Sequence, residues 1–90
     1  MGLVLTHRAG TGVHIEGRER SIDILVKSIS NQNGLSEVTL LISEDGREMS
    51  LRLTDNNEYS RITDDFEIKI NRYLSNQIKI DYKASQDYKI

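Results

Sequence analysis

The sequence of 90 residues contains no cysteine, no proline and no tryptophan. The absence of cysteine excludes a disulfide framework and any cysteine-ligated metal site, and it fits the cytoplasm, where we expect the protein to reside. The absence of proline leaves nothing that blocks the pairing of strands in a sheet. The chain has neither a run of about 18 apolar residues nor a charged start followed by an apolar block, so we expect no membrane span and no signal peptide.

An excess of positive charge is also missing, since the formal net charge is −2. A protein that binds nucleic acid mainly through the phosphates usually carries a strongly basic surface. Any binding of nucleic acid must therefore rest on a local patch and on specific contacts. The chain has two histidines and no pattern of a catalytic triad or of paired carboxylates, so we expect neither an enzyme nor a bound cofactor or metal.

The dominant pattern is a period-two alternation of branched apolar and polar residues, which predicts β-strands. It recurs at residues 3–6, 22–26, 38–42, 49–53, 66–70 and 78–82, with a last short piece at 88–90. Turn residues separate these segments; Asp45-Gly46 suits a tight hairpin, and residues 31–34 and Ser75-Asn76 also favour turns. The even spacing predicts an all-β fold, a small sandwich or barrel of about nine short strands in one domain, residues 1–90.

Three short segments recur in the same order in both halves of the chain. Leu3-Val4-Leu5-Thr6 returns as Leu51-Arg52-Leu53-Thr54, residues 22–26 return as 66–70, and Ser30-Asn31-Gln32 returns as Ser75-Asn76-Gln77. The pattern predicts one repeat over residues 1–53 and another over 49–90, with a shared central strand. Because a unit of about 40 residues rarely sustains its own core, we expect the two repeats to interdigitate around one core with pseudo-twofold symmetry.

Residues 3–15 resemble the opening of the CsrA/RsmA carbon storage regulator family, whose pattern is close to L-V-L-T-R-K-x-G-E-x-I-x-I. Residues 63–70, 75–80 and 84–90 are similar to its G-D-D-I-E-I-x-V, G-N-Q-V-R-L and A-P-K-D-V-x-V segments, with Ser85 where the family has proline. The family forms homodimers in which strands one and five of each protomer flank strands two to four of the other. The resemblance implies a tandem, single-chain version of that dimer, a monomer in which residues 49–54 serve both as the last strand of one copy and as the first of the next.

The resemblance implies an RNA-binding regulator of translation, because family members bind GGA-containing loops of messenger or small regulatory RNA through strands one and five. Carried over residue by residue, it implies RNA contacts from Leu5, Thr6, His7 and Arg8. His7 stands where the family has an arginine, and the nearest cations to the arginine that follows strand five are Arg52 and Lys89. If the central strand is shared, one of the two family sites remains, between residues 3–8 and 87–90.

Other interpretations of the same residues stay open. A protein-interaction module or decoy of this fold, which has lost RNA binding and takes a protein partner, fits the negative net charge and the departures at His7 and after Ile90. The four tyrosines could stack on bases, although tyrosines more often fill or rim a core; they are Tyr59, Tyr73, Tyr82 and Tyr88. His14 is expected on the surface of a strand.

Overall fold

A computed structural model of the chain describes residues 2–18, 20–32, 34–55, 58–74, 76–85 and 88–89. This part of the chain is all-β and has no helix, hence no helix long and apolar enough to cross a membrane. Its strands are β1 (Gly2–His7), β2 (Gly12–Glu16), β3 (Ser21–Gln32), β4 (Leu35–Glu44), β5 (Arg47–Thr54), β6 (Ser60–Thr63), β7 (Phe66–Leu74) and β8 (Gln77–Ala84). The predicted all-β class is confirmed, and the described strands are eight rather than about nine, because at the C-terminal end Lys89 makes only an isolated bridge to Glu16.

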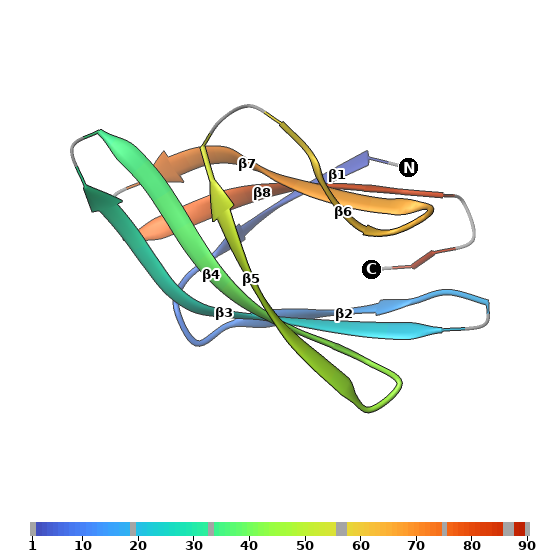
Figure 1. Cartoon of the computed structure of the whole chain (residues 1–90). Helices are drawn as coiled ribbons and strands as arrows, with labels where there is room; N and C mark the ends of the chain where they lie inside the picture. The colour runs from blue at the N-terminus through green and yellow to red at the C-terminus, as the bar shows by residue number, and fades with distance from the viewer. Residues whose placement is uncertain are drawn as a thin grey trace.

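The strands form two antiparallel sheets that face each other (Figure 1). The first sheet has the order β1-β8-β7-β6, and the second has the order β2-β3-β4-β5. Alternation turns one apolar face of each sheet inward, as with Ile22, Ile24 and Val26 of β3, which are at most 2% exposed. The remaining core side chains come from both sheets and include Leu40, Ile42, Phe66, Ile68, Ile70, Ile78, Ile80 and Tyr82.

The first strand does not stay with its sequence neighbours. β1 pairs with β8, with Leu3 opposite Tyr82 and Leu5 opposite Ile80, whereas β2 pairs with β3 in the other sheet. This exchange brings the start of β1 and the segment Tyr88–Lys89 to the same end of the molecule (Figure 1). Both halves of the chain therefore contribute strands to one shared core.

Each sheet contains a bulge in its long central hairpin. In the second sheet the register shifts between Val26 and Ser28, after Val26 has paired with Leu40. In the first sheet the register shifts between Ile70 and Arg72, after Ile70 has paired with Ile80. A bulge bends its strand and increases the local twist, so both hairpins curve at the same point of their ladders.

The predicted turn at Asp45-Gly46 is confirmed, with φ of 50° at Asp45 and 81° at Gly46. Positive φ at both central residues is the requirement of a type I′ hairpin turn. The predicted turn at residues 31–34 is wrong at its start, because Asn31 and Gln32 still pair with β4 and belong to β3. Of the predicted turn at Ser75-Asn76, Asn76 lies in a turn and Ser75 lies outside the described residues.

Core packing predicts the outcome of a matched pair of substitutions in β4. We expect Leu40→Ala to lower the free energy of unfolding by about 2–5 kcal/mol, because it removes buried methyl groups and leaves a cavity. Leu35→Ala is the control, since Leu35 is 50% exposed where Leu40 is 0% exposed. Urea unfolding followed by circular dichroism measures both variants, and equal losses of stability would contradict the assignment of Leu40 to the core.

Candidate nucleic-acid interface

The end of β1 carries four of the predicted RNA-contacting residues, and the alternation of the strand separates them. Leu5 is half-buried and packs against the core, and His7 is buried. Thr6 is exposed on the outer face, where it lies opposite Lys79 of β8, and Arg8 is exposed just beyond the strand. Thr6 and Arg8 are therefore the members of this set that a bound RNA can reach.

His7 is part of the core and does not present its ring to solvent. Its side chain is 5% exposed, its ring packs edge-on against Tyr82 with centroids 5.8 Å apart, and its Nε2 lies 2.7 Å from the Tyr82 hydroxyl. Burial lowers the pKa of His7 below its usual 6.5, which favours the neutral ring, and the tautomer of that ring sets whether Nε2 donates to or accepts from the Tyr82 hydroxyl. The expectation that His7 replaces the family arginine as an RNA contact does not match this placement. The inward positions of Leu3 and Leu5, four and two residues earlier, already indicated that His7 points inward.

Arg8 is anchored at the end of β1 by contacts on both its backbone and its side chain. The Thr11 hydroxyl donates to the Arg8 carbonyl at 2.7 Å and accepts from the Arg8 amide at 3.2 Å. With the amide oxygen of Gln77 turned toward it, the guanidinium donates from Nε at 2.8 Å and from Nη2 at 2.7 Å. One amide oxygen thus already accepts two hydrogen bonds from the planar guanidinium of Arg8, a group that also binds carboxylates and phosphates through two such bonds.

The segment Tyr88–Lys89 is held against the outer edge of β2. Lys89 exchanges two backbone hydrogen bonds with Glu16, at 2.7 and 2.8 Å. The Tyr88 hydroxyl donates to Asp65 at 2.9 Å, and its ring stacks on Phe66 with centroids 5.8 Å apart. This buried tyrosine fixes the position of Lys89, whose side chain is exposed. Residues 87 and 90, which were also predicted to belong to the RNA site, lie outside the described residues.

Arg52 lies away from the other predicted site residues. It is on β5, where its Nε pairs with Glu37 of β4 at 3.1 Å and its side chain is 70% exposed. β5 and the β2 edge that holds Lys89 are opposite edges of the second sheet. The structure therefore does not bring Arg52 and Lys89 together, and Arg52 is not part of the interface at the end of β1.

Charge is divided unequally between the two sheets, which the net charge of the chain conceals. The strands of the first sheet carry the cations Arg61, Lys69, Arg72, Lys79 and Lys83 against the anions Glu67 and Asp81. The strands of the second sheet carry the anions Glu16, Asp23, Glu37, Glu44 and Glu48 against the cations Lys27, Arg47 and Arg52. The first sheet, which includes β1, is thus net positive. Sequence reasoning missed this asymmetry, although its signal is present in the outward positions of the segments 66–70 and 78–82.

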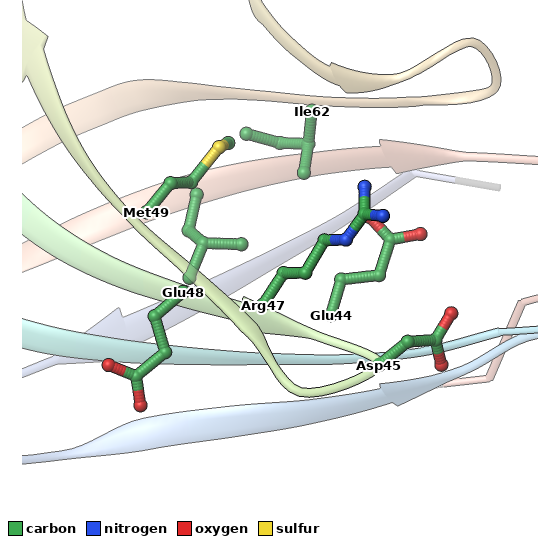
Figure 2. Close-up of a pocket in the computed structure, with 7 residues that line it drawn as sticks. Glu44, Asp45, Arg47, Glu48, Met49 and Ile62 are labelled. Carbon is green, nitrogen blue, oxygen red and sulfur yellow. The ribbon is translucent and has the colours of Figure 1, made fainter.

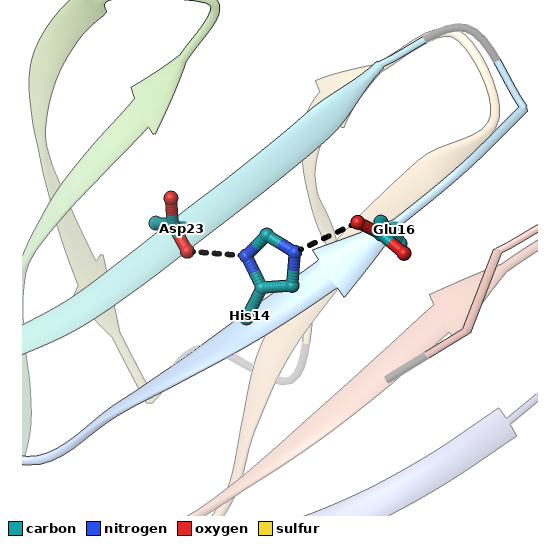
Figure 3. Close-up of polar contacts among 3 residues, drawn as sticks. All are labelled: His14, Glu16 and Asp23. Carbon is teal, nitrogen blue, oxygen red and sulfur yellow. Dashed lines mark hydrogen bonds and ion pairs between the residues drawn. The ribbon is translucent and has the colours of Figure 1, made fainter.

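His14 lies on the outer face of the second sheet, as predicted, between two carboxylates (Figure 3). Its Nδ1 lies 2.6 Å from Asp23 and its Nε2 lies 3.4 Å from Glu16. Hydrogen bonds to Asp23 and then to Glu16 raise the pKa of His14 above 6.5. In the described part of the chain, no group of three or more acidic, histidine or cysteine side chains is arranged to hold a metal ion.

A pocket of about 590 Å³ separates the β4–β5 hairpin from β6 (Figure 2). It is lined by Ile42, Glu44, Asp45, Arg47, Glu48, Met49 and Ile62. Its charges are mixed, and β6 is the edge of the first sheet opposite to β1. This pocket is therefore separate from the interface at the end of β1.

The two histidines predict opposite dependences on pH. We expect the pKa of His7 below 6.5, so that its contribution to stability is present above that pH and is lost as the pH falls through the folded value. We expect the pKa of His14 above 6.5, so that its contribution is present below that pH and is lost as the pH rises through the folded value. Titration of the imidazole resonances by NMR measures both, and a His7 pKa above that of His14 would contradict the burial described above.

The comparison of this chain with protein-family models, with curated proteins and with solved structures finds no match. Its function must therefore be inferred from its own strand order, contacts and charges.

Proposed function

We propose that this chain is a single-chain pseudo-dimer of the CsrA/RsmA type that binds GGA-containing RNA loops and regulates translation in the cytoplasm. The observation that carries the proposal is the exchange of terminal strands between the two sheets. β5 and Lys89 flank the block β2–β4 on its two sides, and β1 flanks the block β6–β8. The resemblance implies this same interleaving, in which strands one and five of one copy enclose strands two to four of the other.

The ladders support a repeat, in a register that differs from the sequence alignment by two residues. Leu5 faces Ile80, and Leu51 faces Leu40, in each case the ladder position that precedes the bulge. On this basis Leu51 corresponds to Leu5, whereas the sequence pattern paired Leu51 with Leu3. A shift of two residues keeps every side chain on its own face, so the alternating pattern alone fits both registers equally well.

The same ladders support one RNA site rather than two. β5 pairs with β4 and takes the place of a first strand, and within the described residues the outer edge of β6 has no paired strand. We therefore propose that residues 49–54 fill one strand position, that of strand one in the second copy, and not two. The remaining site lies along β1, with Arg8 just beyond the end of the strand and the segment Tyr88–Lys89 beside its start.

The chemistry of this site suits an unpaired loop of RNA. Bases in a loop expose their Watson–Crick edges, which backbone groups and side chains at a strand end can bind. Arg8 offers the planar donor fork that pairs with two acceptors, and Thr6 offers a hydroxyl on the same exposed side. Binding would exchange the Gln77 oxygen at the Arg8 fork for an acceptor on the RNA.

We expect binding of a short RNA hairpin with GGA in its loop, and we expect Arg8→Ala to weaken it about tenfold or more, because a charge-assisted pair of hydrogen bonds is lost. Arg47→Ala is the matched control, since Arg47 lines the pocket beside β6 and not the end of β1. Fluorescence anisotropy with labelled RNA measures both. Absence of binding at micromolar protein in low salt would refute the proposed function, and equal losses in the two variants would refute the proposed site.

A fused dimer needs no second copy, so we expect the protein to be a monomer of 10.3 kDa in solution. Light scattering coupled to size exclusion measures this mass. A tight assembly of two chains would instead indicate that strands exchange between molecules.

A protein-interaction module of the same fold is the second candidate, and the pocket beside β6 favours it. Met49, which is 46% exposed, lies with Ile42 and Ile62 in that pocket, next to a strand edge that has no partner within the described residues. An extended segment of a partner protein could pair with such an edge. Failure of the RNA titration, together with retained folding, would favour this candidate.

A further inference from the structure

Tyr59 is an exposed aromatic ring that is held on the outer face of the first sheet. Its hydroxyl donates to Asp81 of β8 at 3.1 Å. The Nζ atoms of Lys69 and Lys83 lie 4.9 and 5.5 Å from the centroid of its ring. The side chain is 37% exposed, whereas Tyr82 and Tyr88 are buried in the core. Contacts from two strands thus fix the orientation of a ring that remains open to solvent.

Cations continue from this ring across the sheet toward the end of β1. Lys83 faces Gly2 on one side and Glu67 on the other, and four residues along β8 Lys79 faces Thr6 on one side and Arg72 on the other. The two lysines point to the same face, and four residues of strand span about 13 Å. Asp81 lies between them on β8; it accepts from the Tyr59 hydroxyl and faces Lys69, so both anions of this face, Asp81 and Glu67, have a lysine opposite them.

This combination of a fixed ring and regularly placed cations is what single-stranded nucleic acid requires. Proteins that bind single strands place cations along the phosphate backbone and stack bases on aromatic rings. The outer face of the second sheet offers the opposite charge, with Glu16, Asp23 and Glu37 among its outward residues. The negative charge of phosphates therefore favours binding to the outer face of the first sheet. The exposed Tyr59 ring favours a ligand that has bases to stack on it as well as phosphates.

We infer that the outer face formed by Thr6, Tyr59, Lys69, Arg72, Lys79 and Lys83 binds single-stranded RNA that flanks the loop held at the end of β1, with Tyr59 as a stacking platform for one base. The inference rests on the proposed function and extends it from the loop to the RNA beside the loop. Lys79 and Lys83 contact the phosphates. On binding, the ammonium groups beside the Tyr59 ring turn to the backbone and leave one face of the ring to the base.

The test compares a hairpin with GGA in its loop and the same hairpin with a single-stranded 3′ extension of about eight nucleotides, which is within the usual site size for one small domain. We expect the extension to tighten binding about tenfold, and we expect Tyr59→Leu to remove most of this gain without changing the affinity for the short hairpin. Tyr59→Phe keeps the ring and is expected to keep most of the gain. An extension of the same length with abasic sites is expected to give a clearly smaller gain.

The cations are tested by the dependence of affinity on salt. Lys83→Gln is expected to reduce the slope of log K against log salt by about 0.7 for the extended RNA, because one phosphate contact is lost. Lys27→Gln is the matched control, since Lys27 is exposed on β3 of the other sheet, and it is expected to leave the slope unchanged. Thermal unfolding of each variant confirms that the fold is retained.

Two results would overturn the inference: an extension that adds no affinity, or a gain that survives both Tyr59→Leu and the abasic extension. Neither result affects binding of the short hairpin, which tests the proposed function separately. If the short hairpin fails to bind while the isolated single strand binds in a manner that depends on Tyr59, recognition of the loop is refuted and the outer face remains a binding surface.

Discussion

The pairing of β1 with β8 joins the first strand of the chain to its last long strand, and the rest of the structure depends on this ladder. It runs from Gly2 opposite Lys83 to His7 opposite Ile78. Without β1, the edge of β8 would be open and the inner sides of Leu5 and His7 would no longer cover the core. The buried Tyr82 hydroxyl would also lose its hydrogen-bond partner, which costs about 1–3 kcal/mol for a buried group. A contact of such long range is slow to form but costs little more in loop entropy than a shorter one.

The same ladder also determines which side chains of β1 are exposed and can contact a ligand. Its alternation turns His7 toward Tyr82 and leaves Thr6 on the outer face beside Lys79. It also sets β1 beside the basic strands of the first sheet rather than beside the acidic strands of the second. A chain with a net negative charge can in this way present a positive surface next to the end of its first strand.

Much of the fold followed from local patterns in the sequence. Residues 22–26 and 66–70 lie within β3 and β7 as their alternation predicted, because a strand with one buried face needs that alternation in any tertiary setting. The turn at Asp45-Gly46 was equally local, since few other residue pairs accept positive φ at both positions. The end of β3 was not predictable in this way, because Asn31 and Gln32 favour turns by themselves and are held in the strand by their partners in β4.

The candidate site was less accessible to sequence reasoning, because it depends on contacts between distant segments. The alternation of Leu3 and Leu5 indicated an inward His7, yet the family motif drew attention to a surface role. Arg52 and Lys89 matched the same family position but lie at opposite edges of one sheet, which no local pattern reveals. The position of the Tyr59 ring depends on contacts with Lys69, Asp81 and Lys83, none of which is near it along the chain.

The exchange of β1 into the sheet of the second half is the central claim, and nuclear Overhauser effects between backbone protons test it most directly. We expect cross-strand effects between β1 and β8, in the register that places Leu5 opposite Ile80, together with effects between Glu16 and Lys89. Cross-strand effects from β1 to β2 or β5, with none to β8, would show that the first half folds on itself and would contradict the exchange of β1.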